Sequence, residues 1–217
     1  QINDVTLETL QSQETLAKNV RDENNLKLSK CRKNVAYILE TTLIKYLVPL
    51  GLSNVRFKVE IKNCNPNEKG IDSIQFLFSA NPGQPLLPLT EIASGGEMSR
   101  FLLALKSTLL QSNSSSTLLF DEIDAGVSGR VSQAIATALK ALSQKRQVFC
   151  VTHQPMVAAS ADHHFSVSKS VVTGMTRSNV KHLIDIKSRE NELAELAGGD
   201  TEETRAFAAS LIERKTA

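Results

Sequence analysis

Two adjacent carboxylates follow a short apolar run. The strand-forming segment 117–120 leads directly into Asp121 and Glu122. Because side chains alternate in direction along a strand, the two carboxylates face different ways. One can hold Mg²⁺ through its water shell while the other orients or deprotonates an attacking water. The pair therefore predicts phosphoryl transfer, although Asp121, Glu122 and the nearby Asp124 would equally suit capping of the following turn.

A serine, two glycines and a glutamate form a second group of interest. Ser94 and Glu97 have the spacing of a capping box, which predicts the start of a helix. Gly95 and Gly96 each cost about 1 kcal/mol relative to alanine within a helix. They favour a site where some group approaches the bare backbone closely. An anion held by the N–H groups of a helix N-terminus is such a group, and a plain helix start is the alternative.

A histidine follows a second apolar segment. Residues 147–152 predict a buried strand, and His153 comes directly after it. If this strand lies parallel to 117–121, their carboxyl ends meet at the edge where open α/β sheets bind ligands. His153 would then reach a terminal phosphate or the attacking water, whereas a lone histidine at a strand end is more often structural.

A long helix precedes these groups. Residues 5–48 contain neither proline nor glycine until Pro49 and Gly51, and apolar residues recur three and four positions apart. Fewer of these repeated positions are apolar toward the N-terminus, as in a loosely packed coiled-coil arm that enters a globular body. An ordinary surface helix packed on one face is the alternative.

The remaining elements are short. Residues 55–61 and 71–79 predict an antiparallel pair around a loop at 63–70, and 98–110 predict a helix followed by a linker at 111–116. Strands 117–121, 147–152 and 165–168 alternate with helices 131–142 and 156–160, which predicts a parallel sheet. A strand over 180–186, a helix over 193–197 stopped by Gly198-Gly199, and a last helix to Arg214 capped by Asp200 with Glu203 complete the chain.

Composition excludes several classes of protein. The 217 residues are 41% hydrophobic with a net charge of +2, which excludes disorder and gives no strong field for nucleic acid. No apolar run is long enough for a membrane span or signal peptide, so we expect a cytoplasmic protein with no membrane partner. Three scattered cysteines argue against a disulfide framework. The first residue is Gln1 rather than Met, so we expect a fragment of something longer.

Together, the motifs resemble those of ABC ATPases. Ser94-Gly95-Gly96-Glu97 resembles the signature motif, residues 118–122 resemble Walker B with its catalytic glutamate, 124–128 the D-loop, and 152–154 the switch-histidine loop. The coiled-coil arm and the glutamate at position 97 are similar to the SMC-like branch. The chain is also similar to bacterial DNA-repair members of that branch in four segments, which extend the resemblance over nearly the whole chain: residues 91–100, 120–127, 161–165 and 198–199.

One element of the family is missing. The Walker A loop needs a Gly-Lys dipeptide, and the sequence contains none. The resemblance therefore implies an α/β fold that is the C-terminal lobe of a P-loop ABC/SMC-type ATPase head, with a mainly parallel sheet flanked by helices. Residues 1–48 would form the coiled-coil base helix and 49–217 the lobe. An N-terminal lobe that carries Walker A would be its partner.

The resemblance also implies roles for single residues. Asp121 would help hold Mg²⁺ through water, Glu122 would polarise the attacking water, and His153 would sense the γ-phosphate of ATP. Five further residues would act at the ATP bound on a second head or at the head–head interface: Ser94, Gly95, Gly96, Glu97 and Asp124. ATP would join two heads into a homodimer, hydrolysis would release them, and the isolated chain would be inactive.

The implied biology is DNA double-strand break repair by a nucleoid-associated protein that meets DNA through its full length. A transporter nucleotide-binding subunit is disfavoured because a coiled-coil helix and β-pair precede the signature. A non-catalytic coiled-coil interaction module with a degenerate nucleotide fold remains open. Five basic residues over 169–189 suit a DNA contact or, more commonly, a solvated sheet edge. His163 and His164 would point to opposite faces of a strand and make a poor metal chelate.

Overall fold

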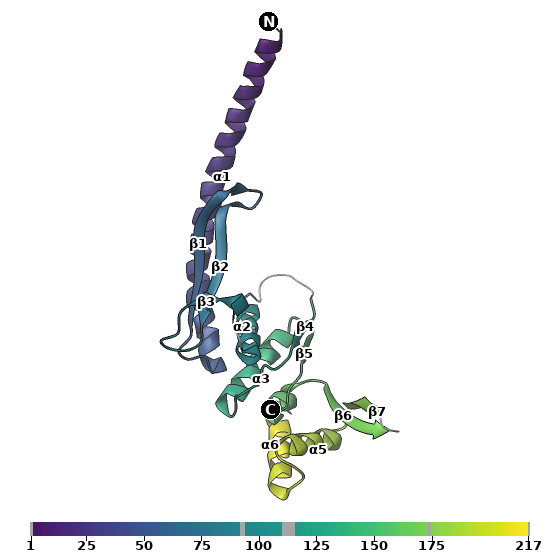
Figure 1. Cartoon of the computed structure of the whole chain (residues 1–217). Coiled ribbons are helices and arrows are strands. Elements are labelled where there is room, and N and C mark those ends of the chain that lie inside the picture. Colours follow the sequence, from purple (N-terminus) through teal and green to yellow (C-terminus); the bar gives the residue numbers. More distant parts are fainter. Residues whose placement is uncertain (1, 92–93, 110–115, 173–174, 217) are drawn as a thin grey trace. The chain divides into compact units, whose positions relative to one another are not determined.

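The computed structural model describes residues 2–91, 94–109, 116–172 and 175–216 (Figure 1). The chain divides into two compact units, residues 1–44 with 55–91 and residues 45–54 with 92–217. The described residues leave out most of the linker predicted at 111–116 and the last residue of the helix predicted over 98–110. They also leave out Ile92 and Ala93, which belong to the segment 91–100 that resembles the family. The domain boundary predicted at residue 48 stays a prediction.

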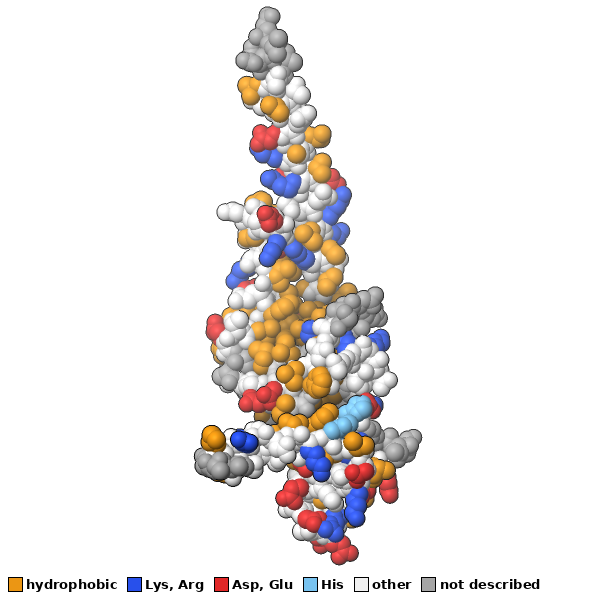
Figure 2. Space-filling model, turned by 90° about the vertical axis from the view of Figure 1, so that its right-hand side faces the viewer, with side chains coloured by type: hydrophobic (Ala, Val, Ile, Leu, Met, Phe, Trp, Pro, Cys, Tyr) orange, Lys and Arg blue, Asp and Glu red, His pale blue; other side chains and the backbone are white. Residues whose placement is uncertain are grey.

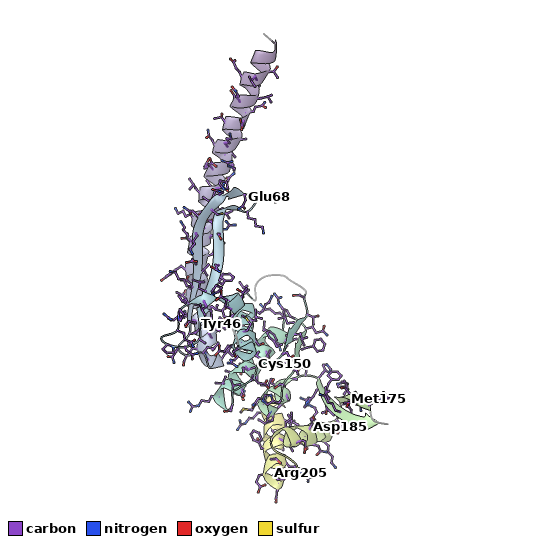
Figure 3. The ribbon with its side chains drawn as sticks, viewed as in Figure 1. Tyr46, Glu68, Cys150, Met175, Asp185 and Arg205 are labelled. Carbon is purple, nitrogen blue, oxygen red and sulfur yellow. The ribbon has the colours of Figure 1, made fainter. Side chains whose placement is uncertain are left out.

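The first unit is built on the long helix α1 (Ile2–Leu47), as predicted. Strands β1 (Arg56–Asn67) and β2 (Gly70–Ser79) pair antiparallel, and the short β3 (Leu87–Pro88) adds to β2 before the 3-10 turn η2 (Leu89–Glu91). The predicted loop over 63–70 is shorter than expected, because residues 63–67 continue β1 after an irregularity in register. Glu68 marks the tip of this hairpin in Figure 3.

A buried carboxylate attaches the hairpin to α1. Asp72 on β2 accepts hydrogen bonds from the Ser29 hydroxyl at 2.8 Å and from Nη1 of Arg32 at 3.0 Å. Further along, the Glu40 carboxylate accepts from the Val59 backbone N–H at 2.7 Å. Because a buried carboxylate is costly unless it is paired, these contacts fix where the hairpin lies along the helix.

The N-terminal part of α1 is exposed on its apolar positions. Leu7, Leu10 and Leu16 each leave more than half of the side chain in contact with solvent, and Figure 2 shows such hydrophobic side chains on the helix surface. A surface helix packed on one face would bury such a stripe. The coiled-coil interpretation explains the exposure, since a coiled coil buries the stripe only against a second helix.

The second unit is centred on a small parallel sheet. Strands β4 (Leu118–Phe120) and β5 (Val148–Cys150) pair parallel with Phe120 opposite Cys150. Helices α2 (Gly95–Thr108), α3 (Arg130–Ser143) and α4 (Pro155–Ser160) accompany them, with the 3-10 turn η1 (Val48–Leu50) next to α3. Fully buried side chains of this core are Phe101, Leu103, Ile123, Ile135 and Leu142. This arrangement confirms the α/β class.

The strand predicted over 165–168 departs from the predicted parallel sheet. Strand β6 (His164–Val172) pairs antiparallel with β7 (Met175–Leu183), with Val167 opposite Val180. Among the described residues β6 makes no pairing with the parallel sheet. The predicted strand over 180–186 ends early, because the Asp185 carboxylate accepts from the Ser188 backbone N–H at 2.7 Å and begins helix α5 (Ile186–Leu196). Figure 3 labels Asp185 at this junction.

The C-terminal helices close the unit. Helix α6 (Glu202–Thr216) packs with α4 and α5 around a cluster that includes Ala159, Leu193 and Ala208. Gly198 and Gly199 end α5 in left-handed backbone conformations, as predicted. The predicted cap of α6 is one residue off: Thr201 accepts from the Thr204 N–H, while Asp200 pairs with Arg205. Within the described residues, no helix has both the length and the apolar character that crossing a membrane requires.

Candidate phosphoryl-transfer site

The carboxyl ends of β4 and β5 lie side by side. The Val151 backbone N–H donates to the Phe120 carbonyl at 2.9 Å, which fixes the last rung of the parallel ladder. Asp121 follows Phe120 directly, and the segment 152–154 follows β5. The two groups of residues singled out from the sequence therefore meet at one edge of the sheet, as the parallel pairing predicted.

Asp124 organises this edge. Its carboxylate is 2% exposed, and one oxygen, Oδ2, accepts from the Thr152 hydroxyl, the His153 backbone N–H at 3.0 Å and the Gln154 backbone N–H at 3.2 Å. His153 Nδ1 lies 3.5 Å from the same oxygen. Oδ2 of this carboxylate is therefore satisfied by donors of its own chain. Its predicted contact with a second head stays a prediction.

Gln154 completes the contact between the two loops. Its amide nitrogen donates to the Val127 carbonyl at 3.1 Å, and its amide oxygen accepts from the Ser132 hydroxyl at 3.5 Å. The His153 side chain is 68% exposed, and its ring nitrogens lie 3.5 Å from Asp124 Oδ2 and 3.5 Å from the Gln154 amide nitrogen. The backbone and the glutamine therefore fix the loop, while the largely exposed imidazole can also meet another group.

Glu122 has an unusual backbone. Its φ of 57° is the one positive value among non-glycine residues in the described part of the chain. Such a conformation costs about 1–2 kcal/mol and persists only where surrounding contacts fix it. The Glu122 N–H donates to Oδ1 of Asp121 at 2.9 Å, so the two carboxylates of the pair have different surroundings although both are exposed.

The glycines of α2 make room for this turn. A Cβ added to Gly95 would collide with Oε2 of Glu122. One added to Gly96 would lie 3.0 Å from the Ala125 Cβ and 3.1 Å from the Glu122 carbonyl oxygen. The close approach predicted from the glycines therefore occurs, and the approaching groups include the chain's own carboxylate at the positive end of a helix.

Ser94 and Glu97 start the helix as their spacing predicted. The Ser94 hydroxyl accepts from the Glu97 backbone N–H at 3.3 Å, and α2 begins at Gly95. Burial lowers the pKa of Arg100 one turn later, and the charge of Glu97 partly offsets this shift. Ser94, Gly95 and Gly96 therefore form one compact corner whose outer face, at Ser94 and Gly95, is exposed.

Two further residues of α2 hold the turn. The Ser99 hydroxyl donates to the Asp121 carbonyl at 2.7 Å. Nη1 of Arg100 donates to the Ile123 carbonyl at 3.3 Å and to the Ala125 carbonyl at 3.1 Å. Sequence reasoning assigned neither residue a role. The available signal was that Arg100 lies on the buried stripe Gly96, Arg100, Leu103, Ser107, where a charged side chain is unexpected.

The thiol next to the site is unreactive. Burial, followed by the nearby carboxylates of Asp124 and Asp121, raises the pKa of Cys150 to about 12. Figure 3 labels Cys150 at the end of β5. Because the thiolate is the nucleophilic form, Cys150 is no nucleophile at neutral pH.

The residues of this site could supply part of a binding site for magnesium and a nucleotide. Asp121 presents an exposed carboxylate at the strand end, and no group of three or more metal-ligating side chains occurs in the described residues. Mg²⁺ commonly keeps several waters and is held by one or two carboxylates plus phosphate oxygens, so one carboxylate is a suitable contribution from the protein. The chain offers no phosphate-binding Walker A loop of its own.

The two adjacent histidines lie apart. His163 is exposed and His164 is buried, so their side chains take opposite faces as the strand pattern predicted. Burial, followed by the charge of Arg189, lowers the pKa of His164. Arg189 itself donates to the carbonyls of Ala159 and Ala161, so this member of the basic segment is used within the chain.

Apolar side chains surround the site on the sheet. Leu119 is 70% exposed, and Phe149 and Val151 are about half exposed; Figure 2 shows hydrophobic side chains on the surface of the molecule. Leu119 and Phe149 are direct partners in the β4–β5 ladder, so they lie on the same face. Parallel sheets are normally covered on both faces, which makes this uncovered face unusual.

Comparison with known proteins identifies the family. The model of the family described as "AAA domain, putative AbiEii toxin, Type IV TA system" matches residues 13–159. DNA repair protein RecN of Synechocystis sp. is 41% identical over 235 aligned residues, which cover 100% of this chain and 40% of that protein. RecN of Treponema pallidum is 40% identical, with 83% of this chain and 33% of that protein covered. The chain thus spans less than half the length of these relatives.

A solved structure confirms the fold. The crystal structure of the Smc head domain with a coiled coil and joint from Pyrococcus yayanosii matches with a TM-score of 0.60 at 20% identity, over 89% of this chain and 36% of that one. This likeness shows a shared fold alone. Because the family match covers more than half of its residues, the chain belongs to this AAA domain family, with bacterial RecN proteins among its relatives.

Proposed function

We propose that this chain is one lobe of an SMC-like ATPase head in a RecN-type protein that acts in DNA double-strand break repair. The observation that carries the proposal is the meeting of Asp121, Glu122 and His153 at the carboxyl edge of β4 and β5. All three side chains are exposed there, which suits groups that meet a ligand. The identity to RecN over the whole chain supports the repair role.

Each exposed side chain has a part in this proposal. Asp121 holds Mg²⁺ through water, and the ion supplies charge neutralisation for the phosphates of ATP. Glu122 orients and deprotonates the attacking water. His153 donates a hydrogen bond toward the terminal phosphate, because its backbone is fixed by Asp124 while its imidazole is largely exposed.

A second lobe completes the site. The sequence has no Gly-Lys dipeptide, so the phosphate-binding loop must come from a Walker A lobe outside this chain. The half-exposed apolar face at Leu119, Phe149 and Val151 supports this partner, since such a face is stable in water only when covered. The chain alone is therefore inactive.

A second head completes ATP-dependent assembly. The corner formed by Ser94, Gly95 and Gly96, exposed at Ser94 and Gly95, contacts the terminal phosphate of the ATP bound by the opposite head, with Glu97 and Asp124 supporting it from the same interface. ATP drives closure only through its tighter binding to the joined state, and hydrolysis removes that preference. The full protein then meets DNA in the bacterial cytoplasm.

ATP turnover tests the proposal. We would measure turnover by this chain alone, by a separately expressed Walker A lobe, and by the mixture, each with and without Glu122→Gln. We expect activity in the mixture only, reduced about 10²- to 10⁴-fold by the substitution because a general base is lost. The matched control Glu195→Gln changes an exposed carboxylate on α5 and leaves turnover unchanged.

Two results would contradict the proposal. Turnover by the chain alone would mean that the missing loop is not needed. An inactive mixture, together with unchanged association of the two lobes, would favour the non-catalytic interaction module instead.

A further inference from the structure

Arg100 is buried without a carboxylate at hydrogen-bonding distance among its described partners. The residue is 7% exposed, and its two described hydrogen bonds go to the backbone carbonyls of Ile123 and Ala125. Its Nε has no partner in the described structure. Burying a charged side chain is costly unless it is well paired, so packing alone does not explain an arginine at this position.

The two carbonyls belong to the turn that carries Glu122. The Ala125 backbone N–H donates to the Glu122 carbonyl at 3.1 Å, which closes the turn. Arg100 binds one carbonyl within the turn and one at its end, both through Nη1, so one nitrogen of the guanidinium bridges the two carbonyls. Glu122, with its left-handed φ, is the first residue of this turn and directly precedes the two residues whose carbonyls Arg100 binds.

The turn is held from two sides. On one side, Ser99 and Arg100 of α2 bind backbone carbonyls of residues 121, 123 and 125. On the other side, Asp124 accepts from the backbone N–H groups of His153 and Gln154. The turn therefore links the N-terminal turns of α2 with the histidine loop, and Glu122 lies between them.

We propose that Arg100 is a positioning residue, which ties the turn of Glu122 to α2 so that the Glu122 carboxylate follows the movement of the Ser94–Gly96 corner. The inference rests on the proposed function, in which that corner meets the second head. Through Arg100, contact at the corner sets the place of the residue that activates water. Arg100 itself touches neither nucleotide nor water.

The test compares three variants in the complex of this chain with the Walker A lobe. Arg100→Met keeps the bulk and removes the donors, Arg100→Lys keeps the charge without the planar fork, and Lys106→Met makes the same change on the same helix away from the turn. The measurements are kcat, KM for ATP and ATP-dependent association of heads.

We expect Arg100→Met to lower kcat about 10²-fold, since misplacement of a catalytic group by about 1 Å has an effect of this size. KM and association stay within about twofold, because the corner and its helix are intact. Arg100→Lys falls between wild type and Arg100→Met. Lys106→Met behaves as wild type.

Two outcomes overturn the inference: an unchanged kcat in Arg100→Met, or an equal loss of kcat and of association, which indicates a merely structural role. If Arg100→Met does not fold, Ser99→Ala removes the 2.7 Å hydrogen bond to the Asp121 carbonyl without exposing a buried charge. It must then lower kcat alone, and an unchanged kcat overturns the inference.

Failure of the proposed function has a different signature. Absence of turnover in the wild-type complex removes the ATPase assignment. Hydrogen exchange of the Ala125 amide in this chain still tests the hold of Arg100 on the turn, with exchange about tenfold faster or more expected in Arg100→Met than in Lys106→Met. Equal exchange in the two variants contradicts it.

Discussion

The turn at residues 121–125 and the β6–β7 pair are stabilised in opposite ways. The turn buries Asp124 and satisfies it with donors from 152–154, and α2 binds three of its carbonyls. The strand pair leaves Val167, Val171 and Val180 more than 60% exposed. In the described residues each of the two strands pairs only with the other. A two-stranded pair is marginal in water by itself.

The turn is held by contacts within the chain, whereas the strand pair has an uncovered apolar surface. Residues that act chemically need fixed positions, and the turn receives them from hydrogen bonds within the chain. The apolar faces of β4–β5 and β6–β7 remain open, as expected if further chain covers them. The following substitutions test this contrast.

Removing the buried carboxylate should have the largest effect on stability. Asp124→Ala leaves the Thr152 hydroxyl and two backbone N–H groups without their acceptor. We expect a loss of about 3 kcal/mol in the free energy of unfolding, because buried donors lose a charged acceptor. Urea denaturation of the chain measures it.

Asp162→Ala is the matched control. Its carboxylate is 57% exposed and pairs with Lys140 at the surface, so the loss should stay below about 1 kcal/mol. Equal losses for the two variants would contradict the contrast between the turn and the surface.

Alanine substitutions at Gly95 and Gly96 should have different effects. Gly96→Ala brings a methyl group to 3.0 Å from the Ala125 Cβ and 3.1 Å from a backbone oxygen, which cannot move aside easily. We expect a loss of about 1–3 kcal/mol in unfolding free energy from overpacking. Gly95→Ala meets only the flexible end of Glu122. It should cost less stability but displace the carboxylate and lower ATP turnover in the complex with the Walker A lobe.

Acid should weaken the end of β6. Burial and the charge of Arg189 lower the pKa of His164, so the folded chain holds it neutral. The unfolded chain takes up a proton as the pH falls below the ordinary histidine value of about 6.5. The stability that neutral His164 allows is therefore present above that pH and is lost as the pH falls toward the folded pKa. Thermal denaturation from pH 7 to pH 5 should show this decline, and His164→Gln should flatten it.

The smallest effect on the chain itself should come from the open face of β6–β7. The double substitution Val167→Thr with Val180→Thr changes two paired, exposed side chains on one face. We expect a change within about 0.5 kcal/mol for each substitution in the chain alone. Association with the Walker A lobe, measured by calorimetry, should weaken if that lobe covers the face. Unchanged association would contradict the idea that the Walker A lobe covers the open face of β6–β7.

Local signals predicted the helix cap and the strand ends around the candidate site. Ser94 caps α2 because serine accepts from the third N–H of a helix, and the acidic pair follows β4 because an apolar run gives way to carboxylates. The parallel pairing of β4 with β5 followed from the intervening helix. These features depend on neighbouring residues, so the sequence contains their cause.

Other features depend on distant packing. The left-handed backbone of Glu122 and the hold of Arg100 arise from contacts between α2 and a turn more than 20 residues away. The antiparallel β6–β7 pair was missed because the strand predicted over 165–168 continues an alternation of strands and helices, which favours a parallel sheet. The cap at Asp185 was hidden within an apolar run that predicted a strand.

Complementation between two inactive heads tests the central claim most directly. Ser94→Arg blocks the corner that serves the opposite head, while Glu122→Gln blocks the water-activating group of its own head. In the complex with the Walker A lobe, each variant alone should be nearly inactive. An equal mixture should recover about a quarter of the wild-type rate, because half of the randomly formed pairs carry one intact site of two. A mixture as inactive as either variant alone would contradict a site shared between two heads.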